Sequence, residues 1–510
     1  MPSGRRPRRP FPVAVIDIGS NSGRVVVLEL DHAGHLRLLS GSRAALRLVH
    51  DVDEGHRLSG ESMARTIDAV RDFHAIAAGA GAKRIVAVAT AAIRDARNGR
   101  HFMSRIRREL GIRVDIIDGD AEARFGFEGA VRGLPVSSGL LFDLGGGSMQ
   151  VSQFQNRRLG SAASLPLGAL RLTEAFLESD PPRPRELRRL RDHVWKHLKR
   201  SRVARLGRRE SLVGTGGTLR NLAKIDRSER RYPITRVHGY VLSLDRLHDV
   251  VSQLAATRQK RRDDIAGLSA DRADSIVGGA VAIETLMEYV RARELVVSGQ
   301  GVREGIALEL LRVGIASPKL VKEASLASLM SRFDGWNPEA ARRRRAVAAA
   351  LVRSLEPLAK PRIVEAIDHG ARLLDLGTSL DYFNRHEHVA DILLVTELNG
   401  FTHEELAFVS ALVRRAGDRH ADSTTLSPLV APSDQAKLDR GAILLALADE
   451  IERRCPRGLP ITVSCRVGSD VRVSVPLLPA WRATDLTRRF ERAFGKPLLV
   501  KAGGLHGRGG

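Results

Sequence analysis

Two pairs of short apolar runs, each pair divided by a glycine-containing turn, form the clearest pattern along the chain. Residues 13–16 and 25–28 flank the first turn, and residues 140–142 and 149–151 flank the second. Apolar runs of this length beside a tight turn are typical of β-hairpins, so the pattern predicts hairpins over 13–30 and again from residue 140. A pattern that occurs twice indicates two lobes built on the same plan.

The two turns also share the sequence Asp-x-Gly-x-x-Ser. Glycines let a backbone approach an oxyanion with its N–H groups turned inward, and hydroxyl groups add donors. An aspartate at a strand end, here Asp17 or Asp143, can hold a divalent cation directly or through water. A lone glycine-rich turn is usually only a turn, but two matching copies favour a phosphate compound and a metal ion between the lobes. The candidate phosphate-binding residues of the two turns are Gly19, Ser20, Asn21, Ser22, Gly145, Gly146, Gly147 and Ser148.

Helical and strand periodicities extend each hairpin into an α/β lobe. For the first lobe, residues 11–135, the pattern predicts a helix over 61–80, a strand over 85–89, a helix near 100–110 and a strand over 114–117. For the second lobe, residues 136–312, it predicts a basic helical region over 183–209, a strand with a glycine loop over 212–218, a helix over 273–292 and a strand over 295–298.

Beyond a break near residues 314–318, the pattern predicts a helical domain over 318–455. Strands over 461–465, 471–475 and 497–500, with a helix between the last two, predict a small α+β tail over 456–502. The basic segment 1–10 and the glycine-rich segment 503–510 are expected to be disordered.

Composition and charge narrow the classes of partner. With 510 residues the chain is too long for one core, and no apolar run approaches the roughly 20 residues that span a bilayer. Its two cysteines, Cys455 and Cys465, have unrelated surroundings, which favours a reducing, cytoplasmic location. A net charge of +23 attracts polyanions, yet at 4% aromatic residues base-stacking platforms are scarce, so nucleic acid is not the expected partner. Charge alone leaves a polyphosphate chain and a genomic preference for arginine as alternatives.

Several segments together resemble the exopolyphosphatase / guanosine-pentaphosphate phosphohydrolase (Ppx/GppA) family. They follow the family's order along residues 11–312. Besides the two turns, they are Ala89-Thr-Ala-Ala-Ile-Arg94, Gly119-x-x-Glu122-Ala-Arg124, Leu165-Pro-Leu-Gly168, Gly214-Thr-Gly-Gly-Thr218, Asp271-Arg-Ala-Asp274 and Ser298-x-x-Gly301-Val-Arg303-Glu-Gly305. The resemblance implies duplicated actin-like or sugar-kinase-like (ribonuclease H-like) lobes with a cleft between them, followed by a helical HD-like domain.

The resemblance also implies roles for individual residues. Glu122 is expected to activate the attacking water, although a glutamate two residues after Asp120, a plausible N-cap, is otherwise a routine first-turn acid whose helix dipole keeps it ionised. Arg94 is expected to contact phosphate, or else to pair with a carboxylate, and Arg24 follows the first turn. The loop of Gly214, Thr215, Gly216, Gly217 and Thr218 is a second backbone-donor nest or simply a tight turn.

Two departures from the family's pattern alter these expectations. Gln150 stands where the family usually has glutamate, so a carboxylate for metal or water has become a neutral amide; its side chain is expected to point toward the cleft. In the helical domain, Leu374-Asp375 stands where the family's module has a His-Asp pair, so no second hydrolase site is expected. Packing, formation of a homodimer or extension of the groove for a long substrate is expected there instead.

The predicted activity is hydrolysis of a phosphoanhydride with Mg²⁺ (or Mn²⁺), with Glu122 and Asp143 as catalytic residues and Asp143 and Asp17 as metal ligands. The substrate is inorganic polyphosphate or guanosine pentaphosphate, because both present the same terminal anhydride. One alternative is a non-catalytic protein that binds guanosine penta- or tetraphosphate, or ATP, in the same cleft. A kinase or actin-like ATPase shares the glycine loops but leaves the segments of Arg94 and Glu122 unexplained.

Overall fold

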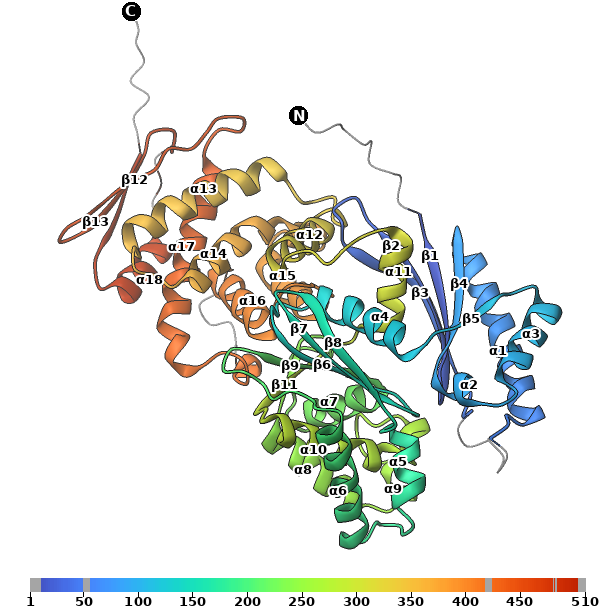
Figure 1. Cartoon of the computed structure of the whole chain (residues 1–510). Helices are drawn as coiled ribbons and strands as arrows, with labels where there is room; N and C mark the ends of the chain where they lie inside the picture. Colours follow the sequence, from blue (N-terminus) through green and yellow to red (C-terminus); the bar gives the residue numbers. More distant parts are fainter. Residues whose placement is uncertain (1–10, 49–55, 418–423, 480, 482–483, 503–510) are drawn as a thin grey trace, which may run out of the picture. The chain divides into compact units, whose positions relative to one another are not determined.

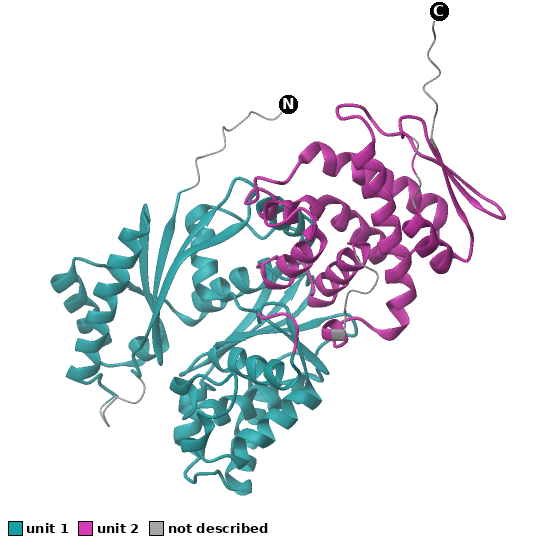
Figure 2. Ribbon diagram, turned by 180° about the vertical axis from the view of Figure 1, so that it is seen from behind, with its two compact units in different colours: residues 1–231, 236–328 teal, residues 232–235, 329–510 magenta. Residues whose placement is uncertain are grey.

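The computed structural model describes residues 11–48, 56–417, 424–479, 481 and 484–502. The chain forms two compact units, of which the first comprises residues 1–231 and 236–328 and the second residues 232–235 and 329–510 (Figure 2). Segments 1–10 and 503–510, for which disorder was expected, lie outside the described residues.

The first sheet of unit 1 confirms the predicted N-terminal hairpin. Strands β1 (Val13–Ile18) and β2 (Ser22–Leu30) pair antiparallel, and β4 (Arg84–Ala89) lies parallel to β1 on its other side. The full strand order is β3-β2-β1-β4-β5, where β3 is Leu36–Ala45 and β5 is Val114–Ile116. Helices α1 (Gly60–Gly79) and α3 (Gly99–Leu110) share a core with these strands, and the short helix α2 (Ala91–Asp95) follows β4.

The second sheet repeats this arrangement and adds one strand. Its order is β10-β11-β9-β6-β7-β8, with β6 in the place of β1 and β7, β8, β9 and β11 in the places of β2, β3, β4 and β5. The strands are β6 (Gly139–Leu144), β7 (Met149–Gln155), β8 (Arg158–Leu165), β9 (Ser211–Gly216), β10 (Tyr240–Ser243) and β11 (Glu294–Val297).

The duplication extends to the register and to the turns. Asp17 lies opposite Arg24 across the first hairpin, and Asp143 lies opposite Gln150 across the second. The Gly19 N–H donates to the Ser22 carbonyl at 3.2 Å, and the Gly145 N–H donates to the Ser148 carbonyl at 2.9 Å. The two Asp-x-Gly-x-x-Ser turns are therefore the same local structure in both lobes.

Helices of the second lobe gather around a buried central helix, α10 (Ile276–Val290), which packs against α5, α6, α7 and α8 (Figure 1). It is apolar on nearly every face, so it can be enclosed in this way. The surrounding helices are α5 (Ala169–Phe176), α6 (Pro184–Arg200), α7 (Gly217–Glu229) and α8 (Leu244–Ala256), and α9 (Gln259–Arg262) follows α8.

Two helices cross between the sheets. Helix α4 (Gly119–Arg132) follows the first sheet in sequence, but Phe127 and Val131 pack against Leu141 and Phe154 of the second sheet. Helix α11 (Val302–Leu311) follows the second sheet and places Ile306 in a cluster with the first sheet's strands. A Cβ on Gly129 would lie 1.9 Å from the Gly301 carbonyl oxygen, so glycine permits the close approach of the two helices.

Unit 2 is a group of helices followed by a small sheet. The sheet has the order β12-β13-β14 and carries α18 (Thr484–Phe494) between its last two strands. Helix α12 (Pro318–Met330) spans the boundary between the units. The helices and strands are α13 (Pro338–Leu355), α14 (Pro361–Leu373), α15 (Arg385–Val395), α16 (His403–Gly417), α17 (Gln435–Arg454), β12 (Ser464–Val467), β13 (Val471–Val475) and β14 (Leu498–Ala502).

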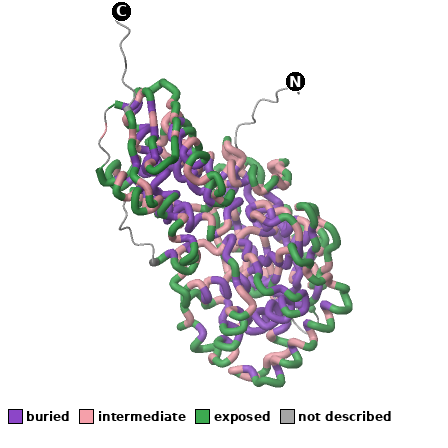
Figure 3. Tube along the Cα trace, turned by 90° about the vertical axis from the view of Figure 1, so that its left-hand side faces the viewer, coloured by how far each residue is buried: buried purple, intermediate pink, exposed green. Residues whose placement is uncertain are grey.

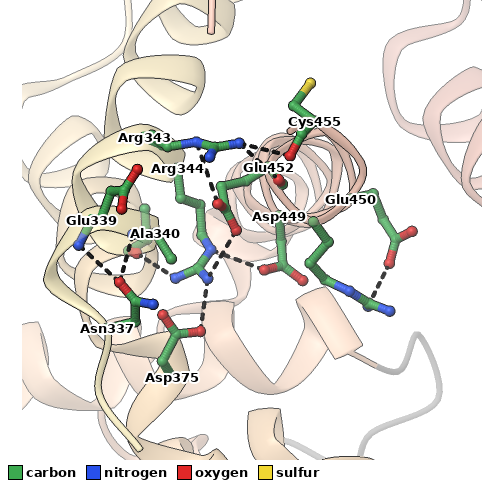
Figure 4. A network of polar contacts seen from close by, with 12 residues as sticks. Asn337, Glu339, Ala340, Arg343, Arg344, Asp375, Asp449, Glu450, Glu452 and Cys455 are labelled. Carbon is green, nitrogen blue, oxygen red and sulfur yellow. Dashed lines mark hydrogen bonds and ion pairs between the residues drawn. The ribbon is translucent and has the colours of Figure 1, made fainter. Parts of the chain in front are cut away.

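The core of unit 2 contains a guanidinium, that of Arg344 on α13, which is 1% exposed. Its Nη2 donates to Asp375 Oδ1 at 2.7 Å and its Nε to Asp449 Oδ1 at 2.9 Å (Figure 4). Its Nη1 donates to the Ala371 carbonyl at 3.0 Å. Arg385 also donates to Asp449. One buried cation thus joins segments from α13, α14 and α17, and Asp375, the residue after Leu374, is one of its partners.

Several elements differ from the predictions. The basic helical region expected over 183–209 ends as a helix at Arg200, and the strand expected over 461–465 begins only at Ser464. Strands β3, β8 and β10 were not predicted.

Buried positions run through the interior of the chain while the outermost turns of the helices are exposed (Figure 3). Among the described residues, no helix combines the length and apolarity needed to cross a membrane.

Candidate functional site

One pocket of unit 1 gathers the turns of both hairpins. It has a cavity volume of about 130 Å³ and lies at the carboxyl ends of β1, β4, β6 and β9. Of the residues predicted from the sequence, those that line it are Asp17, Gly19, Ser20, Asn21, Ser22, Arg24, Glu122, Asp143, Gly145, Gly146, Gly147, Ser148, Thr215, Gly216 and Gly217. Residues more than 190 positions apart in sequence therefore face one cavity.

The two turns approach each other across this pocket. A Cβ on Gly147 would lie 3.4 Å from Ser20 Oγ and 3.5 Å from Ala91 Cβ, so the second turn lies against the first turn and the start of α2. Gly168 closes the second turn from behind, because a Cβ there would lie 2.2 Å from the Gly146 carbonyl oxygen. Helix α5 begins at this point, and its Ala169 N–H donates to the Gly145 carbonyl at 2.9 Å. These contacts explain the Leu165-Pro-Leu-Gly168 segment.

Glu122 reaches the pocket from the first turn of α4. The N-cap of this helix is Asp118, whose side chain accepts from the Ala121 N–H at 2.8 Å, and not Asp120 as predicted. Gly126 lies one turn further along the same face, and a Cβ there would lie 3.7 Å from Asp143 Oδ2. Helix α4 therefore holds Glu122 beside Asp143, although the two residues belong to different lobes in sequence.

Electrostatics at Glu122 differ from the expectation that a helix dipole keeps it ionised. Burial, reinforced by Asp143, raises the pKa of Glu122 to about 7, and Arg94 opposes the rise. Arg94 Nη1 donates to Glu122 Oε2 at 3.2 Å and to the Ile117 carbonyl at 3.0 Å. A carboxyl group with a pKa near neutrality suits a general base.

Asp17 and Asp143 lie at equivalent strand ends, and both have raised pKa values. Burial raises the pKa of Asp143 to about 6, and Asp17 adds to the rise. Burial likewise raises the pKa of Asp17, while Arg303 and Arg24 lower it. Carboxylates that repel one another in a recessed pocket are relieved by a cation, and hard oxygen ligands without Cys or His suit Mg²⁺ or Mn²⁺.

The protein alone does not supply a complete coordination sphere. Within the described ranges, no three His, Cys, Asp or Glu side chains lie close enough together to hold a metal ion. Mg²⁺ commonly binds through one or two carboxylates and takes its remaining ligands from water and substrate phosphates. The residues present fit that mode of binding.

Four arginines line the pocket, three of which were absent from the predicted set: Arg220, Arg272 and Arg303. Burial lowers the pKa of Arg24, and the positive charges of Arg220, Arg303, Arg43 and Arg272 lower it further. Because a guanidinium stays charged in proteins, such a cluster is stabilised by an anion. The sequence could have pointed to these residues. Arg220 lies one turn into the helix after the Gly214–Thr218 loop, and Arg272 and Arg303 lie in segments that carry the family resemblance.

Arg272 reaches its place because of a glycine. A Cβ on Gly217 would lie 2.6 Å from Arg272 Nη2, so any larger residue would displace the guanidinium. The preceding residue, Asp271, pairs with Arg43 of β3, and its carbonyl oxygen lies 3.5 Å from Asn21 Nδ2. The Asp271–Asp274 segment therefore touches the site and also joins the second lobe to the first.

Four predicted residues lie outside the pocket lining. Arg94 pairs with Glu122, the carboxylate alternative considered for it. Gly214 faces the core, where a Cβ would lie 2.4 Å from Phe142 Cζ, and Thr218 is buried against Gly279 of α10. Gln150 is 2% exposed and does not line the pocket itself, but its side chain points toward it, because its amide donates at 2.8 Å to Oγ of the pocket-lining Ser148.

Comparison with curated proteins gives relatives over most of the chain. Exopolyphosphatase 1 of Mycobacterium tuberculosis (strain ATCC 25618 / H37Rv) is 31% identical over 327 residues, which cover 63% of this chain and 95% of that protein. A guanosine-5'-triphosphate,3'-diphosphate pyrophosphatase of Photobacterium profundum is 25% identical over 418 residues, which cover 81% of each protein.

Solved structures show the same fold for the two lobes. The Ppx/GppA family member of Aquifex aeolicus superposes with a TM-score of 0.51 at 28% identity, covering 59% of this chain and 98% of that one. An exopolyphosphatase from Cytophaga hutchinsonii superposes with a TM-score of 0.55 at 26% identity, covering 60% and 100%. These neighbours confirm the predicted two-lobed α/β architecture.

Family models agree with the individual relatives. Residues 26–313 match the Ppx/GppA phosphatase family, and residues 321–458, the helices of unit 2, match domain III of the same phosphatases. The prediction of a phosphatase is confirmed, and this chain belongs to the Ppx/GppA phosphatase family.

Proposed function

We propose that this chain hydrolyses a terminal phosphoanhydride and releases phosphate from inorganic polyphosphate, guanosine pentaphosphate or both. The observation that carries the proposal is the position of Glu122, a carboxyl group of near-neutral pKa that faces two glycine turns, two aspartates and four arginines in one pocket. The names of the relatives in Mycobacterium and Photobacterium supply the two substrate classes.

The proposed step is attack of water on the terminal phosphorus. Glu122 accepts the proton of the attacking water, the anhydride P–O bond breaks, and the bridging oxygen stays with the shortened substrate. Arg94 holds the Glu122 carboxylate in orientation through their 3.2 Å hydrogen bond. The backbone N–H groups and hydroxyls of the two turns stabilise charge on the transferred phosphoryl group.

Asp143 and Asp17 are the proposed ligands of Mg²⁺ (or Mn²⁺). Such an ion, when bound, neutralises charge on the phosphate oxygens. The proposed partners of phosphates beyond the scissile bond are the four arginines Arg24, Arg220, Arg272 and Arg303. They lie in the same pocket, where the four positive charges face three acidic side chains. Ser148 is likewise proposed to contact phosphate, and its hydroxyl accepts a hydrogen bond from Gln150.

Further parts of the proposal concern the whole protein. Unit 2 is proposed to contain the family's HD-like module in degenerate form, with Asp375 bound to Arg344 where a His-Asp pair would serve a metal. The domain limits 11–135, 136–312, 318–455 and 456–502, a cytoplasmic location and a homodimer remain predictions.

The test is phosphate release from long-chain polyphosphate and from guanosine pentaphosphate, side by side, with Mg²⁺ and with EDTA. The proposal predicts release from at least one substrate with Mg²⁺ and a loss of release with EDTA. Tight binding of guanosine penta- or tetraphosphate, or of ATP, without release under either condition would instead support a non-catalytic binding protein.

A further inference from the structure

Exposed lysines and arginines form a strip on the second lobe, along α6 and the segment that follows it. Between residues 183 and 209, eleven lysines and arginines are exposed, and Asp192 is the one exposed acid. Three more exposed cations, Arg258, Lys260 and Arg261, lie in the segment around α9. We call these fourteen residues the basic strip.

Few of these charges are neutralised within the protein. Among the described residues, Arg189 alone of the strip forms an ion pair within 4.0 Å, with Glu178, while the charge of Arg183 lowers the pKa of Glu186 and Arg205 lies over the ring of Tyr289 at 5.9 Å. Glu186, in the first turn of α6, is 2% exposed and accepts from the Ser179 hydroxyl and the Arg183 N–H. Like charges spaced three and four residues apart on a helix repel each other, and a bound polyanion relieves this repulsion.

The strip connects to the pocket through Arg262, which is 3% exposed. Its Nη1 donates at 2.9 Å to the carbonyl of Ala273, the residue after Arg272 of the pocket. On its other side, Asp180 lies 3.8 Å from Arg262 Nη2 and accepts from the Gln259 N–H at 2.8 Å. Helix α6 starts four residues after Asp180. The basic segment 258–262 therefore lies between Arg272 of the pocket and the first turn of α6.

From there the strip leads away from the site. Helix α6 runs beside α10, since Arg191 bonds Glu284 at 2.7 Å and the rings of Trp195 and Tyr289 lie 5.1 Å apart. Helix α10 begins just after Arg272, and β9, which follows the strip, ends at the pocket. The strip therefore extends from the pocket side of the lobe to its opposite side, over about 25 Å along α6 alone.

We propose that the basic strip holds the distal part of a linear inorganic polyphosphate whose terminal phosphate lies in the pocket. The inference rests on the proposed function and selects the long phosphate chain over guanosine pentaphosphate, which is too short to leave the pocket and follow α6. A single-stranded nucleic acid fits less well, because Trp195, at 39% exposure, is the one exposed aromatic side chain within the strip, and successive bases require several stacking partners.

The test reverses three unpaired charges of the strip, Arg185→Glu, Arg188→Glu and Lys196→Glu, in the full chain. The matched control, Lys83→Glu, Arg100→Glu and Arg107→Glu, reverses the same residue types at exposed sites of the first lobe, so the net charge changes equally. The strip variant should raise KM for long-chain polyphosphate about tenfold or more and leave tripolyphosphate unchanged. It should also flatten the salt dependence of the long-chain KM by about 2 in log–log slope, by analogy with other phosphate chains. Equal effects of the two triple variants would overturn the proposal.

A binding measurement separates failure of the strip from failure of the proposed function. Trp195 lies among the strip's cations, so its fluorescence should change on addition of long-chain polyphosphate and should not respond in the Trp195→Phe variant. If no substrate releases phosphate, a fluorescence change that the strip variant loses still supports the strip. Tighter binding of a single-stranded RNA of equal charge than of polyphosphate would show that the strip serves nucleic acid and would refute the proposal.

Discussion

Glu122 is subject to opposing influences on its charge. Its place in the first turn of α4 and its hydrogen bond from Arg94 favour the carboxylate, whereas burial and the neighbouring Asp143 favour the protonated acid. Burial outweighs the others and brings the pKa to about 7. A base of this strength takes a proton from water more readily than an ordinary glutamate, whose pKa is near 4.3.

The pH dependence of turnover should follow this group. Only ionised Glu122 accepts a proton, so kcat/KM should fall about tenfold per pH unit below pH 7 and level off above it. Initial rates between pH 5 and pH 9 check the profile. The variant Glu128→Gln, on the same helix but outside the pocket, should keep the acidic limb, and a wild-type profile that is flat from pH 5 to pH 9 would contradict the assignment.

The free energy of unfolding should depend on the same group, but it should fall with rising pH while turnover increases. Because folding raises the pKa of Glu122, the folded state binds more protons between pH 4.5 and 7, so the carboxyl group's contribution to stability is lost as pH rises through 7. Glu122→Gln should therefore unfold like wild type at pH 4.5 and be more stable at pH 8, by at most about 3 kcal/mol. Urea unfolding at the two pH values measures the difference, and lower stability of the variant at pH 8 would count against a desolvated carboxylate.

Gln150 offers a test of the metal site. It lies opposite Asp143 in the hairpin and is buried, so Gln150→Glu would place a second carboxylate beside the first. Without metal the two charges repel and the melting temperature should fall, whereas added Mg²⁺ should restore it and the Mg²⁺ concentration for half-maximal activity should drop below that of wild type. Gln150→Ala, which removes the bond to Ser148 without adding charge, is the control. An unchanged or higher Mg²⁺ requirement in Gln150→Glu would move the metal away from Asp143.

At this scale the sequence predicted the local residues of the site and missed the distant ones. Asp17, Asp143 and the two turns carry their signal within eight residues each. Arg220, Arg272 and Arg303 come together only through the order of strands and helices, which no short segment encodes. Alternation along the strand predicted that Gln150 points toward the pocket, but it does not reveal that Ser148 accepts a hydrogen bond from its amide.

At the scale of elements, a single methyl group in the second hairpin turn tests whether that turn binds substrate. Gly147→Ala would place Cβ 3.4 Å from Ser20 Oγ, an ordinary contact, but inside the proposed phosphate site. The variant should fold normally and raise KM about tenfold or more, as measured by initial rates and thermal melting. Gly79→Ala, near the end of α1 with no atom within 4 Å, should leave KM unchanged, so equal kinetics of the two variants would exclude the turn from substrate binding.

The helical element of unit 2 depends on its buried cation. Arg344→Ala would leave Asp375 and Asp449 buried without their principal partner, which typically costs about 3–5 kcal/mol. Arg342→Ala, two residues earlier and exposed, should cost less than about 1 kcal/mol. Calorimetry of both variants should show a lower unfolding temperature only for Arg344→Ala, and equal melting would mean that the network contributes little.

Element prediction succeeded where burial enforces a period and failed at edges. Strand β13 was predicted with its observed limits because Val471, Val473 and Val475 alternate inward. Strands β3 and β8 lie at the edges of their sheets and consist mostly of exposed or half-exposed positions, so no alternation marks them. Helix α6 ends at Arg200 because the buried series Leu190, Val194 and Leu198 stops there, although basic residues continue to Arg209.

At the scale of the whole molecule, the exchange of α4 and α11 creates the site. Helix α4 follows the first sheet in sequence but packs on the second, and α11 follows the second sheet but packs on the first. Glu122 on α4 therefore lies between the turns of both lobes. The sequence indicated duplicated lobes through their repeated turns, but the crossing depends on glycines such as Gly129 and Gly305, whose partners lie far along the chain. The pocket is therefore built by both lobes of unit 1.

The most direct test compares phosphate release by wild type and Glu122→Gln at pH 8 with Mg²⁺, on whichever substrate the wild type turns over. The amide keeps the shape of the side chain and removes only the base, so kcat should fall about 10²–10⁴-fold while KM stays within about threefold. A Glu122→Gln enzyme that folds and retains kcat close to that of wild type would contradict the account.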